Sequence, residues 1–145
     1  MKKTLLTVAT VALMATSAFG VTNECKEELM TLKKDLSNLT DKGAECLAEN
    51  ITLMMNNALA KQASSQEKMN FAYKNKTVIM QMSTTSTKEK KITKEQQSTL
   101  IKNACKNPLY RGLMQHGIKW KIDMKIPQQH AVVDITDKVC KQNNF

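Results

Sequence analysis

Four cysteines are the residues of this chain whose chemistry most constrains what it can be. Cys25, Cys46, Cys105 and Cys140 are widely spaced, without the C-x-x-C pair typical of zinc sites and redox-active thiols. In an oxidising compartment an even number of cysteines indicates disulfides. Four cysteines allow three pairings, and we favour Cys25–Cys46 with Cys105–Cys140. These bonds would close loops of 21 and 35 residues, each contributing roughly 3–4 kcal/mol.

The two histidines are poorly placed for catalysis. His116 falls at the end of a predicted helix and His130 in a predicted hairpin turn. A catalytic histidine needs an orienting carboxylate and a nucleophile nearby. Asp134 and Asp137 are the nearest acids that follow His130 in the sequence, but strand alternation sends Asp134 towards solvent. We therefore predict no catalytic residue and no enzymatic activity, and a small hydrolase using His130 and Asp134 is a minor alternative.

The methionines raise the question of a soft-metal site. Met80, Met82 and Met124 carry thioethers that favour Cu(I) in oxidising compartments. Met80 and Met82 share a strand face with Val78, however, so we expect them to fill the core. Only three glycines follow residue 20 and they are not clustered, so a phosphate-binding glycine loop is absent. The sequence predicts neither a metal nor a cofactor.

Residues 1–20 have the pattern of a secretory signal peptide. Lys2 and Lys3 precede a short apolar run, and Ala18-Phe19-Gly20 places small residues at the cleavage positions. No second apolar stretch of about 18 residues follows. The residues before Cys25 lack the small-residue sequence of a lipid-attachment site. We expect a soluble periplasmic protein of residues 21–145 without stable membrane insertion, with secretion beyond the periplasm as an alternative.

The expected mature chain is basic, with 20 Lys and Arg against 13 Asp and Glu. An excess of this kind suits nucleic acid, an anionic membrane surface or an acidic protein. The lysines are dispersed, Arg111 is the single arginine, and aromatic residues make up only 4%. Nucleic-acid binders more often combine clustered basic residues with stacking aromatics. We therefore expect an acidic protein partner and no nucleic acid.

The first part of the mature chain, residues 21–62, is predicted to be helical. Leucines at three- and four-residue spacing form one apolar face over residues 29–39, and Leu47, Ile51 and Met54 begin a second. Residues 40–43 between them offer a helix stop and an N-cap. A Cys25–Cys46 bond would favour two helices folded back on each other, with one kinked helix as the alternative.

Residues 63–145 are predicted to form two hairpins with a helical segment between them. Large apolar residues alternate over 69–73 and 78–82 around a turn at 74–76, and again over 118–126 and 131–135. Thr93 with Gln96 forms a capping box for one helix, and Asn107-Pro108 starts a second that stops at Gly117. We predict a single α+β domain, with an antiparallel sheet that has helices on one face and a polar, lysine-rich second face.

The polar face of this sheet is the predicted partner-binding site. Its members are Lys119, Lys121, Lys125, Gln81 and Thr136. An unpaired strand edge could also accept an extended peptide. The alternative is a solvated face whose lysines prevent edge-to-edge aggregation.

Residues 54–140 resemble a pattern found in many small exported, disulfide-bonded bacterial proteins of mostly unknown function. The matching features are Cys105-Lys106-Asn107-Pro108, the turn at Gly117 and the late Cys140. More loosely, the layout is similar to the α+β pilotins of type II secretion systems, which help outer-membrane secretin rings to assemble. Pilotins are usually lipoproteins, and this chain lacks the lipid-attachment sequence. The resemblance supplies structural positions and no catalytic residues.

These observations together suggest a non-enzymatic accessory or binding protein. The resemblance implies a soluble helper of a secretion, pilus or conjugation apparatus, whose partner would be a secretin or pilus component. A periplasmic inhibitor or immunity protein that binds a toxin or hydrolase is the alternative, because such proteins are small, disulfide-bonded and often opposite in charge to their target.

Overall fold

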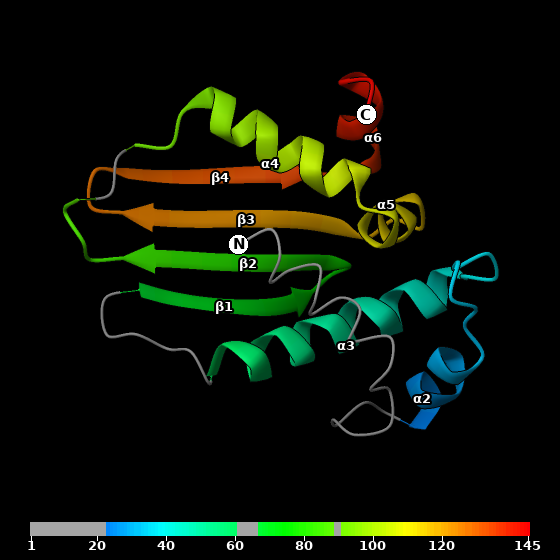
Figure 1. Cartoon of the computed structure of the whole chain (residues 1–145). Coiled ribbons are helices and arrows are strands. Elements are labelled where there is room, and N and C mark those ends of the chain that lie inside the picture. Colours follow the sequence, from blue (N-terminus) through cyan, green and yellow to red (C-terminus); the bar gives the residue numbers. More distant parts are fainter. Residues whose placement is uncertain (1–22, 61–66, 89–90) are drawn as a thin grey trace.

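The computed structural model describes residues 23–60, 67–88 and 91–145, and the predicted signal peptide lies outside these residues. The chain forms a four-stranded sheet flanked by helices (Figure 1). Its elements are α2 (Asn23–Met30), α3 (Asp41–Ala60), β1 (Glu67–Lys74), β2 (Thr77–Thr84), α4 (Lys94–Lys106), α5 (Pro108–Gln115), β3 (Lys119–Ile126), β4 (Gln129–Ile135) and α6 (Asp137–Gln142). The predicted α+β class, the two hairpins and the two disulfides are confirmed.

The sheet is mixed, which corrects the prediction of an antiparallel sheet. Its strand order is β1-β2-β3-β4, and both hairpins are antiparallel, but β2 and β3 run parallel with Val78 opposite Trp120. The chain leaves the end of β2, passes through α4 and α5, and returns to the end where β2 began. A crossover through helices allows parallel pairing, whereas a hairpin turn cannot.

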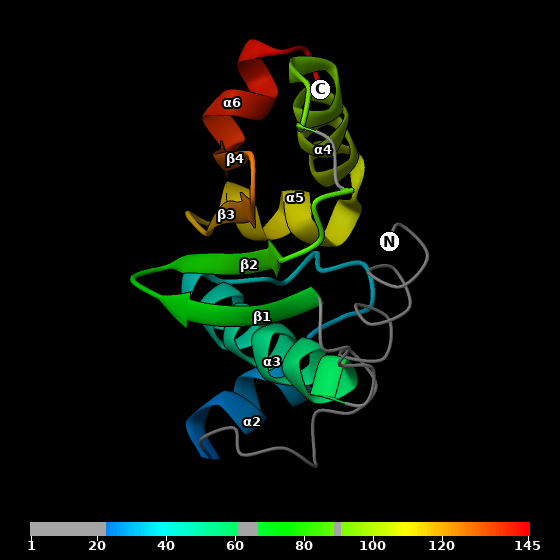
Figure 2. The same cartoon turned by 90° about the vertical axis from the view of Figure 1, so that its left-hand side faces the viewer.

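Strand alternation sorts the sheet residues into a buried face and an open face. One row that is buried on all four strands contains Phe71, Met80, Ile122 and Val133. Figure 2 shows α4 and α5 on the same side of β3 and β4. The rings of Tyr110 and Trp120 lie 4.4 Å apart in this core. Burial raises the pKa of Tyr110 to about 12.

The prediction that the leucine pattern of residues 29–39 continues the first helix is wrong. The helix ends at Met30, and the next ten residues form turns in which Leu36 has a φ of 58°. The Asn38 side chain accepts from the Lys33 amide and donates to the Thr31 carbonyl, and Asp35 accepts from Ser37. Such side-chain bonds satisfy backbone groups that a helix would otherwise use. Leu39 is still buried, so its apolar side chain reaches the core from a turn.

The predicted helix boundaries in the crossover are confirmed. Thr93 and Gln96 form the capping box of α4, and the Asn107 side chain accepts from the first amides of α5. At the other end of α5, the Gly117 amide bonds to the Met114 carbonyl and the next amide to Leu113, with Gly117 at a φ of 89°. This Schellman arrangement turns the chain directly into β3.

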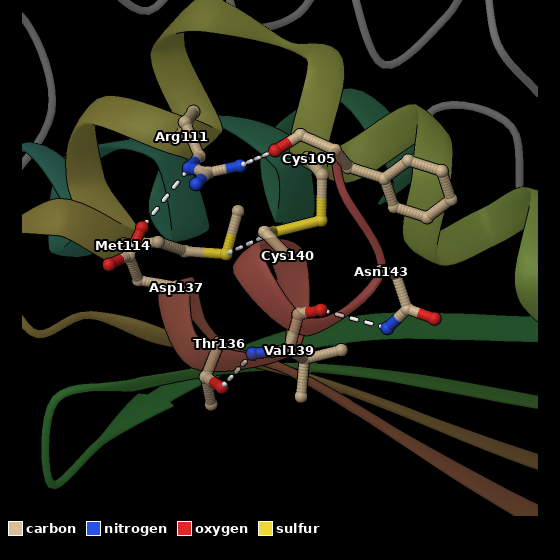
Figure 3. Close-up of a disulfide and its surroundings, with 9 residues drawn as sticks. Cys105, Arg111, Met114, Thr136, Asp137, Val139, Cys140 and Asn143 are labelled. Atoms are coloured by element: carbon tan, nitrogen blue, oxygen red, sulfur yellow. Dashed lines mark hydrogen bonds and ion pairs between the residues drawn. A yellow bond between two sulfur atoms is a disulfide. The ribbon is translucent and has the colours of Figure 1, made fainter.

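A corner of the fold joins α4, α5 and α6 (Figure 3). Cys105 at the end of α4 is bonded to Cys140 in α6, whose sulfur lies 4.0 Å from that of Met114. Arg111 donates from Nε to Asp137 at 3.1 Å. Sequence patterning missed α6, although Thr136 caps it by accepting from the Val139 amide. Thr136 therefore serves as a helix cap instead of joining the predicted partner-binding face.

The same Arg111–Asp137 contact predicts a pH-dependent stability. A hydrogen bond from the Lys141 ammonium, with the nearby Arg111 charge, holds the pKa of Asp137 below its usual 3.8. The carboxylate therefore stabilises the folded state above that pH, and this contribution is lost as the pH falls through the lowered value. Asp137→Asn should cost about 1 kcal/mol at neutral pH, measured by urea unfolding.

The difference between the native protein and Asp137→Asn should shrink as the pH is lowered below 3.8. Asp134→Asn is the control, because Asp134 lies exposed on β4 without an ion pair among the described residues. It should change the free energy of unfolding by less than about 0.5 kcal/mol. A difference for Asp137→Asn that is constant with pH would contradict the proposed charge interaction.

The β1–β2 turn predicts a stabilising substitution. Asn75 and Lys76 form a two-residue turn in which both have positive φ, 51° and 58°, as a type I′ turn requires. Glycine adopts this conformation without the steric penalty that a lysine carries. Lys76→Gly should raise the free energy of unfolding by about 0.5–1 kcal/mol, measured by urea denaturation. Lys74→Gly, at the last strand position before the turn, should lower the free energy of unfolding. Equal destabilisation by both substitutions would refute the steric penalty proposed for Lys76.

Candidate functional site

The open face of the sheet collects side chains from all four strands. Its exposed or half-buried basic members are Lys68, Lys74, Lys119, Lys121 and Lys125, and its acidic members are Asp123 and Asp134. The face therefore carries a net positive charge. Because side chains alternate along each strand, these residues point away from the core.

The structure places the predicted contact residues together on this face. Gln81 on β2 is opposite Asp123 on β3, and Lys119, Lys121 and Lys125 follow one another along β3. Gln81, Lys119 and Lys125 are exposed, while Lys121 is half-buried between its neighbours Ile79 and Asp134.

A shallow hollow of about 370 Å³ lies over one half of the face. It is lined by Lys68, Met69, Asn70, Gln81, Met82, Ser83, Asp123 and Lys125. Sequence patterns alone do not predict that β2 and β3 contribute to the same hollow. The predicted hairpin over residues 69–82 already places Asn70 beside Gln81, but it does not indicate that β3, with Asp123 and Lys125, lies on the other side of β2.

His130 has a different carboxylate partner from the two acids considered in the sequence. Its Nε2 lies 2.6 Å from Asp123 Oδ1, across the β3–β4 hairpin on the open face. His116 lies at the C-terminus of α5, with Nδ1 2.8 Å from Asp41. The described residues contain no group of three or more His, Cys, Asp or Glu side chains that could hold a metal ion. Among them, no helix is both long and apolar enough to cross a membrane.

The outer edge of β1 is occupied by a side chain, which bears on the prediction of peptide addition. Helix α3 runs beside this strand (Figure 1). Asn56 donates from Nδ2 to the Phe71 carbonyl at 2.6 Å and accepts at Oδ1 from the Phe71 amide at 2.7 Å. One amide side chain thus takes the two hydrogen bonds that a neighbouring strand would make with Phe71. The centre of this edge is therefore less suited to an added strand than the open face is to a partner surface.

This contact predicts that Asn56 is important for stability. Asn56→Ala leaves the amide and the carbonyl of Phe71 without these partners and should lower the free energy of unfolding by about 1–3 kcal/mol. Asn57, the next residue of α3, is exposed, so Asn57→Ala should cost less than about 0.5 kcal/mol. Both values can be measured by urea unfolding, and similar costs for the two variants would refute the role of Asn56.

Comparison with known proteins finds similarity at the level of structure. No protein-family model matches the sequence, and a comparison with curated proteins finds no match. The pilotin EpsS of the Vibrio vulnificus type 2 secretion system is 18% identical, and the match covers 69% of this chain and 94% of EpsS with a TM-score of 0.55. The Vibrio cholerae type II secretion pilotin AspS is 21% identical over the same shares, with a TM-score of 0.47.

The likeness to EpsS shows a shared fold. The loose similarity to pilotins noted in the sequence is supported to that extent, while the resemblance to small exported bacterial proteins stays a prediction. The periplasmic location and the partner are likewise not decided by a shared fold.

Proposed function

We propose that the protein is a non-enzymatic accessory protein of the periplasm that binds a component of a secretion, pilus or conjugation apparatus through the open sheet face. The observation that carries this proposal is the fold shared with the pilotin EpsS over 94% of that protein. A shared fold at 18% identity leaves the partner to be argued from the surface, so the second support comes from the residues of the open face.

The open face has the features of a surface that recognises another protein. Its charge is mixed but mainly positive, which favours an acidic partner and suppresses basic ones. Ile79 is half-buried and Val132 is exposed among the polar residues, so apolar area is available beside the charges. Interfaces of this kind combine apolar contact with polar groups that fix the register of the two partners.

The predicted signal peptide and the disulfide bonds support the proposed location. Both pairs of cysteines are bonded, Cys25 to Cys46 and Cys105 to Cys140, and disulfides persist in oxidising compartments. The first bond connects α2 to α3, and the second connects α4 to α6. The open sheet face therefore belongs to a domain in which two pairs of helices are joined by disulfides.

Site-specific photo-cross-linking in cells tests the function. A photoreactive amino acid in place of Gln81, at the centre of the open face, should cross-link to an outer-membrane secretin subunit or a pilus component. The control position is Ser98, which is exposed on α4 and should give no such product. Lys121→Glu should reduce the Gln81 cross-link by about tenfold, because a like charge then faces the acidic partner.

A second charge reversal controls for the loss of net charge. Lys102→Glu on α4 changes the protein by the same charge away from the sheet and should leave the cross-link intact. Cross-linking from Ser98 and Gln81 alike would contradict the proposed surface. A 1:1 cross-linked product with a toxin or hydrolase would instead support the inhibitor alternative.

A further inference from the structure

The open face contains a row in which two lysines flank a hydroxyl group. Lys68 on β1 is opposite Ser83 on β2, and Ser83 is opposite Lys125 on β3. The three residues come from three adjacent strands and all line the hollow. Both lysines are exposed, and Ser83 is half-buried between them. We call Lys68, Ser83 and Lys125 the lysine–serine row.

The spacing of this row suits one small anionic group. Adjacent strands lie about 4.8 Å apart, so Lys68 and Lys125 begin about 10 Å from each other with Ser83 midway. Each lysine has a flexible four-carbon stem, which lets both ammonium groups converge above the serine hydroxyl. An anion seated there would receive two charge-assisted hydrogen bonds and a third from Ser83.

The groups of the row are available for a ligand. None of the three side chains makes a hydrogen bond or ion pair with another of the described residues. Asp123, the nearest acid on the face, is already bonded to His130 at 2.6 Å. Its charge also lies close to the hollow, so a group with a single negative charge is better tolerated there than a doubly charged one.

A second row on the same strands provides an informative contrast. Lys74, Thr77 and Lys119 repeat the arrangement of lysine, hydroxyl and lysine across β1, β2 and β3. Here, however, the Thr77 hydroxyl donates to the Asn75 carbonyl at 3.2 Å, and none of the three residues lines the hollow. Composition alone therefore does not distinguish the two rows, but local bonding and surface shape do.

We infer that the lysine–serine row binds the side-chain carboxylate of an aspartate or glutamate in an extended acidic segment of the partner protein. This inference rests on the proposed function, in which the open face is the binding surface. Asn70 and Gln81 lie two residues further along β1 and β2, about 7 Å from the row. Their amide side chains can pair with the peptide groups that adjoin the bound carboxylate, which favours a peptide over a free anion.

The probe for the test is a short capped peptide that carries two glutamates at alternate positions. Titrated into the isotope-labelled protein, it should shift the backbone amide NMR signals of Lys68, Ser83 and Lys125. The analogue with glutamine in place of both glutamates has the same length and no charge. It should bind about tenfold more weakly or worse, since the charge-assisted hydrogen bonds are lost.

Matched variants separate the row from general surface charge. Lys68→Gln with Lys125→Gln should weaken binding of the glutamate peptide about tenfold or more, and Ser83→Ala about threefold. Lys94→Gln with Lys102→Gln removes two charges from α4 and should change the affinity less than about twofold. Lys74→Gln with Lys119→Gln removes two charges from the open face and should cost less than about threefold.

Three outcomes would overturn the inference. The first is an equal loss on removing Lys74 and Lys119, which would mean diffuse attraction to the whole face. The second is equally tight binding of glutarate or inorganic phosphate at the row, which would mean a free-anion site. The third is the absence of shifts at the row when the glutamate peptide is added.

The two proposals can fail separately. Gln81 could cross-link to a secretin or pilus component while the peptide causes no NMR shifts at the lysine–serine row. That result would support the proposed function and contradict carboxylate binding by the row. The peptide could instead bind as expected while Gln81 gives no such cross-link. That result would support carboxylate binding by the lysine–serine row and contradict the assignment to a secretion, pilus or conjugation apparatus.

Discussion

The parallel pairing of β2 with β3 is the constraint on which the rest of this structure depends. Each hairpin could form from local sequence, but a two-stranded hairpin alone is at best marginally stable in water. The pairing of Val78 with Trp120 joins them into one sheet. It also requires a crossover, and placing α4 and α5 of that crossover over the buried face leaves the other face open. The same register brings Ser83 beside Lys125 and Gln81 beside Asp123.

Two kinds of contact stabilise the periphery of the sheet. One links the helices to each other, and the other protects the edge of β1 from pairing with another strand. Covalent bonds join helix to helix, with Cys105–Cys140 connecting the end of α4 to α6 directly after the last strand. A polar contact protects the first strand, where Asn56 takes both hydrogen-bonding groups of Phe71. Exposed strand edges invite pairing with other chains. Part of the hydrogen-bonding capacity of the β1 edge is thus satisfied by Asn56 of the same chain. The lysines of the open face, in contrast, point towards solvent.

The fold shared with EpsS and the chemistry of the open face contribute different parts of the functional argument. A fold indicates what surfaces are available, and it is compatible with many functions. The open face narrows these choices through its charge and through the placement of its groups. Lys68, Ser83 and Lys125 stand in one row, whereas Thr77 in the parallel row is already bonded to Asn75. A partner would therefore meet a patterned surface and not a uniform positive field.

The sequence by itself determined the strands and the helix boundaries of the crossover, but not the turns after Met30 or helix α6. Alternation over residues 118–126 assigned the two faces of β3, and short-range capping at Thr93, Asn107 and Gly117 marked helix boundaries, because these signals act within a few residues. Only the tertiary structure decided that β2 and β3 run parallel, that Asn56 reaches Phe71, and that Lys68 joins Ser83 and Lys125 at one hollow. Periodicity states which way a side chain points along its own strand, but the identity of the neighbouring strand and the register between them follow from packing of the whole core.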